Sequence, residues 1–118
     1  MTTTDTAAIA RTYFDTWSTR SGPDELRELM AEGFTFRAGD LVIEGREQFL
    51  AIGEWPEHAV TELVTQACDG PSAIQIYEAT NAGVSVKVVD HLTIEDGRVL
   101  SSDTICDGES FQAFMAAG

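Results

Sequence analysis

Asp90 is the residue best placed to do chemistry, because its side chain falls in an otherwise aliphatic row. The segment 84–95 reads VSVKVVDHLTIE, and side chains on a strand alternate between two faces. The face that carries Asp90 holds only aliphatic neighbours: Val84, Val86, Val88, Leu92 and Ile94. An ionised carboxylate there loses hydration, so we expect the pKa of Asp90 to be raised. Such an acid is typical of a functional site, although a structural aspartate bonded to a hydroxyl or backbone N–H fits the pattern equally well.

Tyr13 is the second candidate. Ile9, Tyr13 and Trp17 recur at helical spacing and predict an amphipathic helix whose buried face is aromatic. A tyrosine hydroxyl on such a face either reaches the surface or finds a buried partner. Beside a protonated Asp90, Tyr13 would supply a second hydrogen-bond donor to a developing oxyanion.

The two histidines fit this chemistry less well. His91 follows Asp90 directly, so strand geometry points its side chain to the opposite, polar face. His58 lies in a predicted loop after Trp55-Pro56, where a solvated or rim position is expected. Asp103 lies on the last strand, where the weak alternation does not orient it.

The sequence shows no cofactor or metal motif. It has no phosphate-binding glycine loop, HExxH, EF-hand loop or GxSxG elbow. Its two cysteines, Cys68 and Cys106, lack ligand spacing and are expected to be reduced thiols. We therefore expect neither a cofactor nor a metal.

The elements that must position these residues are four helices and six strands. Helical patterns cover residues 4–20, 23–33, 46–52 and a last segment from about Glu109. Strand patterns cover 34–38, 41–44, 60–68, 72–80, 84–95 and 98–107, separated by Gly-, Asn- and Asp-containing turns. Strands joined by hairpins and segregated from the helices predict an α+β domain with a mostly antiparallel sheet.

The amino-acid composition excludes some classes of partner and favours others. The 118 residues include 20 acidic and 7 basic side chains, a net charge of −13. That charge excludes nucleic acid as a partner and disfavours anionic membrane surfaces, and it favours a neutral ligand over an anionic one. The N-terminus lacks the pattern of a signal peptide, and no apolar run is long enough for a membrane span. We expect one domain over residues 1–118 in a cytoplasmic protein.

The chain resembles the nuclear transport factor 2-like superfamily, and within it the SnoaL-like polyketide cyclases and ketosteroid isomerases. The matching residues are Tyr13, LMAEGF at 29–34, GRE at 45–47 and VDHLTIEDGRV at 89–99. The resemblance implies a cone, the cystatin-like α+β barrel, in which a curved sheet wraps around the helices and encloses an apolar pocket. It also implies a homodimer formed through the outer sheet face, a neutral Asp90 that donates to the oxyanion, and Tyr13 as its partner.

The resemblance leaves the reaction open. The general base of the isomerases aligns with Ala38, and Asp40 lies two residues further on in a turn. An epoxide hydrolase relative would carry an aspartate where Thr104 stands. One hypothesis is an isomerase or aldol-type cyclase acting on a hydrophobic, oxygenated small molecule; the alternative is a ligand-binding or dimerisation module that has lost its base. A pocket would be lined by these residues: Trp17, Phe34, Phe36, Phe49, Trp55, Val88 and Thr104.

Overall fold

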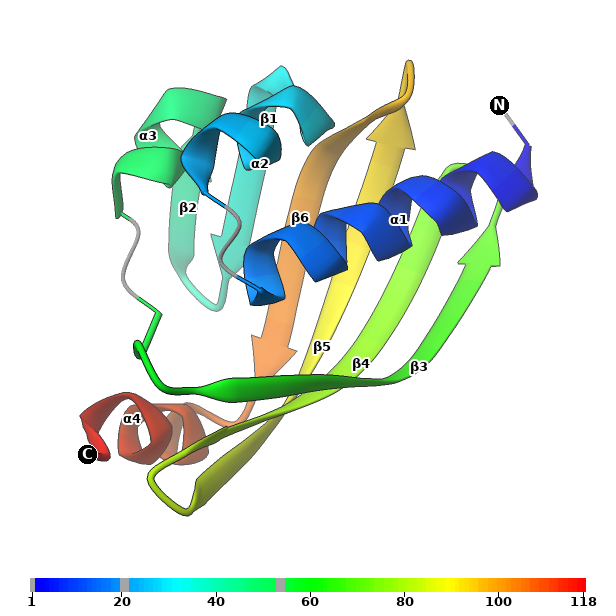
Figure 1. Ribbon diagram of the computed structural model, residues 1–118. Helices are drawn as coiled ribbons and strands as arrows, with labels where there is room; N and C mark the ends of the chain where they lie inside the picture. Colours follow the sequence, from blue (N-terminus) through cyan, green and yellow to red (C-terminus); the bar gives the residue numbers. More distant parts are fainter. Residues whose placement is uncertain (1, 20–21, 53–54) are drawn as a thin grey trace.

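A strongly curved six-stranded sheet forms the body of the molecule, and the long first helix lies across its concave face (Figure 1). The computed structural model describes residues 2–19, 22–52 and 55–118. The strand order is β2-β1-β6-β5-β4-β3. Every neighbouring pair is antiparallel except β1 and β6, which are parallel. The predicted α+β class and the curved, mostly antiparallel sheet are therefore confirmed.

The elements follow the sequence closely. The helices are α1 (Thr3–Ser18), α2 (Pro23–Leu29), α3 (Arg46–Ile52) and α4 (Gly108–Ala116). The strands are β1 (Met30–Ala38), β2 (Leu41–Glu44), β3 (Val60–Asp69), β4 (Ser72–Asn81), β5 (Val84–Glu95) and β6 (Arg98–Cys106). The first helix ends at Ser18, before the predicted end at Arg20, which lies outside the described residues.

The predicted end of the second helix at Gly33 is wrong. The helix ends at Leu29, and Met30 already belongs to β1, where it pairs with Val99 of β6. Met30 is fully buried in the core. A parallel pairing between segments about seventy residues apart overrides the local helical pattern, because burial in the sheet stabilises more than helix propensity does.

The hairpin turns set the register of the central strands. Ala82 and Gly83 both have positive φ, as a two-residue turn requires, and the β4–β5 ladder runs without a break from Asn81↔Val84 to Ser72↔Thr93. The β5–β6 ladder is different, because its register shifts between Thr93 and Ile94. Leu100 is the extra residue of this bulge, and beyond it every residue of β6 moves to the opposite face.

Two hydrophobic clusters fill the concave side. One surrounds Tyr13, Phe34 and Leu92, and the other surrounds Phe14, Tyr77 and Phe114. Trp17 packs against both clusters.

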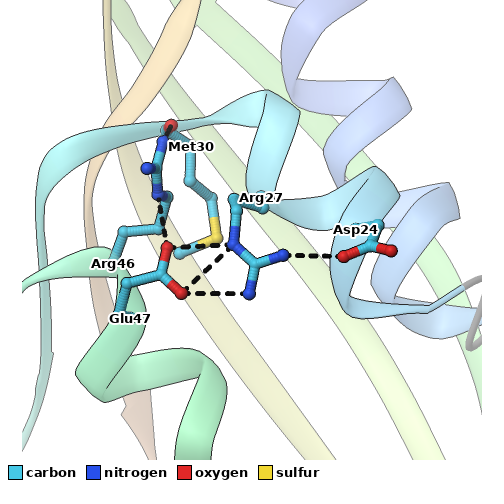
Figure 2. A network of polar contacts seen from close by, with 5 residues as sticks. All are labelled: Asp24, Arg27, Met30, Arg46 and Glu47. Carbon is cyan, nitrogen blue, oxygen red and sulfur yellow. Dashed lines mark hydrogen bonds and ion pairs between the residues drawn. The ribbon is translucent and has the colours of Figure 1, made fainter.

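A polar network holds the short helices α2 and α3 together (Figure 2). Arg27 of α2 donates twice from Nε and once from Nη2 to the carboxylate of Glu47 in α3, and it also pairs with Asp24 at 2.7 Å. Arg46 donates to Glu47 and, at 3.3 Å, to the backbone oxygen of Met30. The network therefore fixes both helices against the start of β1, one wall of the concave side.

Candidate active site

Asp90 lies at the seam between the two hydrophobic clusters. Along the inner row of β5, Val88 belongs to one cluster and Leu92 to the other, and only 5% of Asp90 is exposed. Its carboxylate Oδ1 accepts a hydrogen bond from Thr104 Oγ1 at 2.8 Å. The predicted orientation of Asp90 within an aliphatic row is thus confirmed, and its nearest polar partner is a hydroxyl on the neighbouring strand.

Burial controls the ionisation of this carboxyl group. Loss of hydration raises the pKa of Asp90 from its ordinary value of 3.8 to about 6, and hydrogen bonds from Thr104 and Tyr77 oppose that rise. The two hydroxyl donors favour the charged form, yet desolvation prevails because the group is almost completely enclosed. Asp90 therefore exchanges its proton near neutral pH.

Two buried tyrosines accompany Asp90. Tyr13 comes from α1 and Tyr77 from β4, and each is 4% exposed. Burial raises the pKa of both phenols, and the negative charge of Asp90 raises it further. Both hydroxyls thus keep their protons across the physiological range, and that of Tyr77 donates a hydrogen bond to Asp90.

A row of side chains crosses the inner face of the sheet at the level of Asp90. The pairing places Gln66 opposite Gln75, Gln75 opposite Asp90, and Asp90 opposite Thr104. Ala38 of β1 pairs with Thr104 on one side and with Leu41 of β2 on the other. The position that aligns with the isomerase base is therefore two strands from Asp90, or about 10 Å at the usual spacing of strands.

The residues predicted to line a pocket fall into separate groups. Trp17, Trp55 and Val88 lie in the cluster around Tyr77, with the Trp17 and Trp55 rings 5.6 Å apart. Phe34 and Phe36 pack on Phe49 of α3, in the other cluster. Thr104 touches Asp90 itself. Asp90 therefore lies between the two groups, with Tyr77 in the first cluster and Tyr13 in the second.

An open hollow of about 460 Å³ lies elsewhere. It is lined by Asp5, Ala8 and Ile9 of α1 and by Asp96 and Gly97 of the β5–β6 turn. None of the predicted site residues borders it. A pocket at Asp90 consequently stays a prediction.

The remaining polar candidates face away from Asp90. His91 points to the convex side, as predicted, where its Nδ1 lies 4.0 Å from Asp103 Oδ2. Asp103 also pairs with Arg37 at 3.6 Å on that outer face. His58 is an exposed loop residue. Within the described parts of the chain, no three His, Cys, Asp or Glu side chains are grouped so as to hold a metal ion.

Tyr77 and Gln75 are the site residues that sequence reasoning missed. The hydrophobicity of Ile74 and Ile76 suggests that these residues of β4 face the core. The buried residues of the strand are instead Ala73, Gln75, Tyr77 and Ala79. The turn at Ala82-Gly83 carried the missing signal, because an unbroken two-residue hairpin places Gln75 opposite Asp90 and Tyr77 opposite Val88.

Comparison with known proteins gives a consistent result. The sequence matches the SnoaL-like domain over residues 10–102. A Kribbella flavida protein provisionally named a ketosteroid isomerase is 29% identical, with a TM-score of 0.84 over 89% of this chain and 79% of its own. No curated protein matches the chain significantly.

Two further solved structures share the fold. A Jannaschia protein provisionally named a SnoaL-like polyketide cyclase is 20% identical, with a TM-score of 0.83 over 98% of this chain and 94% of its own. A nuclear transport factor 2-like protein of unknown function from Cytophaga hutchinsonii is 17% identical, with a TM-score of 0.78 over 91% of this chain and 94% of its own. At these identities the likeness concerns the fold alone.

Proposed function

The chain belongs to the SnoaL-like domain family of the nuclear transport factor 2-like superfamily, and on this premise we propose that it is a cofactor-independent acid–base enzyme. It would isomerise or cyclise, by an aldol-type reaction, a hydrophobic and oxygenated small molecule. The observation that carries the proposal is the buried carboxyl group of Asp90 with two buried tyrosines and Thr104 around it.

The proposed chemistry is stabilisation of an enolate. Neutral Asp90 donates its proton toward the enolate oxygen, and the Tyr13 and Tyr77 hydroxyls are candidates for further donors. Donors that are fixed in place and shielded from water stabilise developing charge more than water does. A pKa of about 6 suits a proton that must leave and return near neutral pH.

Ala38 favours a second candidate, a ligand-binding module. Among the described residues Asp90 is the one buried carboxyl group, so no second carboxylate accompanies it as a base. An enzyme would then need Asp90 to exchange the proton alone or the substrate to supply a basic group. A binding module needs neither, and it would hold the same ligands without turnover.

Ligand binding at controlled pH tests the proposal. Substituted phenols mimic an enolate, and their binding is followed by the fluorescence of Trp17 and Trp55. We expect binding to the wild type to weaken as the pH rises through about 6, because the neutral acid is then lost. Asp90→Ala should weaken binding at pH 5 by about 10- to 100-fold.

Asp103→Ala is the matched control, since it removes a carboxylate from the outer face of the same pair of strands. It should leave phenol binding unchanged. Equal binding by wild type and Asp90→Ala would remove Asp90 from the site. Binding without any turnover of enolisable ketones would leave the binding module as the function.

The partners are also part of the proposal. A net charge of −13 favours a neutral ligand, because an anion is repelled at long range. A second copy of the chain is the proposed protein partner, through the convex face of the sheet. Across that face Ile76, Val89 and Ile105 lie in one register row, and Ile105 is 65% exposed.

The described helices include none long and apolar enough to cross a membrane.

A further inference from the structure

Two glutamines form a hydrogen-bonded chain whose direction is fixed by α1. Gln66 Nε2 donates to the backbone oxygen of Ala7 at 3.0 Å. Gln75 Nε2 donates to the backbone oxygen of Ala10 at 2.9 Å and to Gln66 Oε1 at 2.8 Å. Backbone oxygens only accept hydrogen bonds, so both amide nitrogens must face the helix and neither amide can be flipped.

This orientation leaves one strong acceptor unused. Gln75 is fully buried, and within the described residues no donor reaches its Oε1. Because the amide nitrogen of Gln75 is directed to α1 and β3, its oxygen points away from these two elements. An unsatisfied buried carbonyl oxygen is costly, and such an atom in a native fold calls for an explanation.

The register supplies the missing donor. Gln75 is paired directly with Asp90, and both side chains lie on the inner face. Facing residues in an antiparallel pair have Cβ atoms about 5 Å apart, within reach of a hydrogen bond between long side chains. We propose that Gln75 is a positioning residue whose Oε1 accepts a hydrogen bond from the protonated carboxyl group of Asp90 when no ligand is bound.

The protonated acid completes the chain from one end to the other. Thr104 donates to Asp90 Oδ1, Asp90 donates to Gln75, Gln75 donates to Gln66, and Gln66 donates to α1. The arrangement holds the proton of Asp90 at a defined place until a substrate oxygen takes it. The inference rests on the proposed function in one respect, that Asp90 is neutral.

The other titratable groups near Asp90 do not replace Gln75. Tyr13 of α1 and Tyr77 of β4 keep their phenolic protons because burial raises their pKa, and the hydroxyl of Tyr77 is already engaged as a donor to Asp90. Cys106 of β6 has a thiol whose pKa is likewise raised by burial and by Asp90. A thiol is a weak acceptor.

The test is an NMR pH titration of the Asp90 carboxyl carbon in the wild type and in Gln75→Met. Methionine has nearly the same length but no strong acceptor. If Gln75 stabilises neutral Asp90, the midpoint should fall in the variant by about one pH unit. If Gln75 only fills space, the more apolar surroundings should raise the midpoint or leave it unchanged, and that result would overturn the proposal.

Gln66→Met is the matched control, because it breaks the same chain but leaves Gln75 Oε1 in place. It should leave the midpoint of Asp90 unchanged. If Gln75→Met does not fold, the proposal can still be tested in the wild type. The chemical shift of the Gln75 side-chain carbonyl carbon should change with pH at the midpoint of Asp90, and a pH-independent shift would refute the contact. A wild-type midpoint near 3.9 would instead remove the neutral acid, and the proposed function with it.

Discussion

Asp90 owes its ionisation behaviour to enclosure rather than to a charged partner. Its two direct donors are the hydroxyls of Thr104 and Tyr77, and both favour the anion. Desolvation outweighs them, because nearly all of the carboxyl group's water is removed. The same enclosure that makes the acid useful therefore makes it costly to the fold when it is charged.

This cost predicts a stability effect with a definite sign. The folded pKa of about 6 lies above the unfolded value, so the folded state binds the proton more tightly and loses stability as the pH rises from about 4 to 6. Asp90→Asn removes the charge. The free energy of unfolding of this variant should exceed that of the wild type by about 3 kcal/mol at pH 8 but by little at pH 4, as measured by urea unfolding at both pH values.

The comparison of the two pH values within one variant serves as its control. An equal change in the free energy of unfolding at pH 4 and pH 8 would mean that ionisation of Asp90 does not destabilise the folded state. Asp90 would then be an ordinary hydrated aspartate.

At the scale of elements, α4 is held to the sheet by one buried amide. Asn81, at the end of β4, donates from Nδ2 to the backbone oxygens of Phe114 at 2.8 Å and Ala117 at 2.9 Å. Phe114 is fully buried against the cluster that contains Tyr77. The docking of α4 therefore covers the cluster that contains Tyr77.

Asn81→Ala should loosen α4 before the rest of the fold. Loss of the Asn81 amide leaves the Ala117 carbonyl oxygen without its partner and leaves Phe114 O with only the 3.4 Å bond from Ala117 N–H, which should lower the free energy of unfolding by about 1–3 kcal/mol. Hydrogen exchange should show faster exchange in α4 than in β5. Thr80→Val, which changes an outward hydroxyl on the same strand, is the control. Uniform acceleration over all elements would contradict a local role for Asn81.

At the scale of the whole molecule, the convex face of the sheet is the prominent unpartnered surface. Ile105 is 65% exposed and Ile74 is 38% exposed, beside the ion pair of Arg37 and Asp103. Apolar side chains projecting from a polar sheet are typical of an interface. They support the proposed homodimer.

Ile105→Glu should abolish that dimer. In sedimentation velocity the wild type should run at twice the monomer mass of 12.8 kDa, and the variant at the monomer mass. A buried, unpaired carboxylate at the interface centre is the physical reason. Ile52→Glu, at an isoleucine of α3 that is 55% exposed and lies outside the sheet, should leave the dimer intact. A wild type that remains monomeric at micromolar concentrations would refute the assembly.

The sequence by itself determined most of the elements and the inner position of Asp90. Alternation in 84–95 depends only on the period of a strand, and hairpin turns such as Asp96-Gly97 depend only on local backbone preferences. These features are encoded within a few residues, so they could be predicted without the fold. The position of Gln75 and Tyr77 was also encoded, through the Ala82-Gly83 turn.

Only the tertiary structure decided what stands beside Asp90. A regular hairpin at Asp96-Gly97 would have placed Asp103 opposite Asp90, with two carboxylates buried together. The bulge at Leu100 shifts the strand by one residue, so that Thr104 faces Asp90 and Asp103 turns outward to Arg37. This shift, like the parallel pairing that brings Ala38 into the same row, arises because burial and charge across the whole sheet outweigh the local preference of a turn.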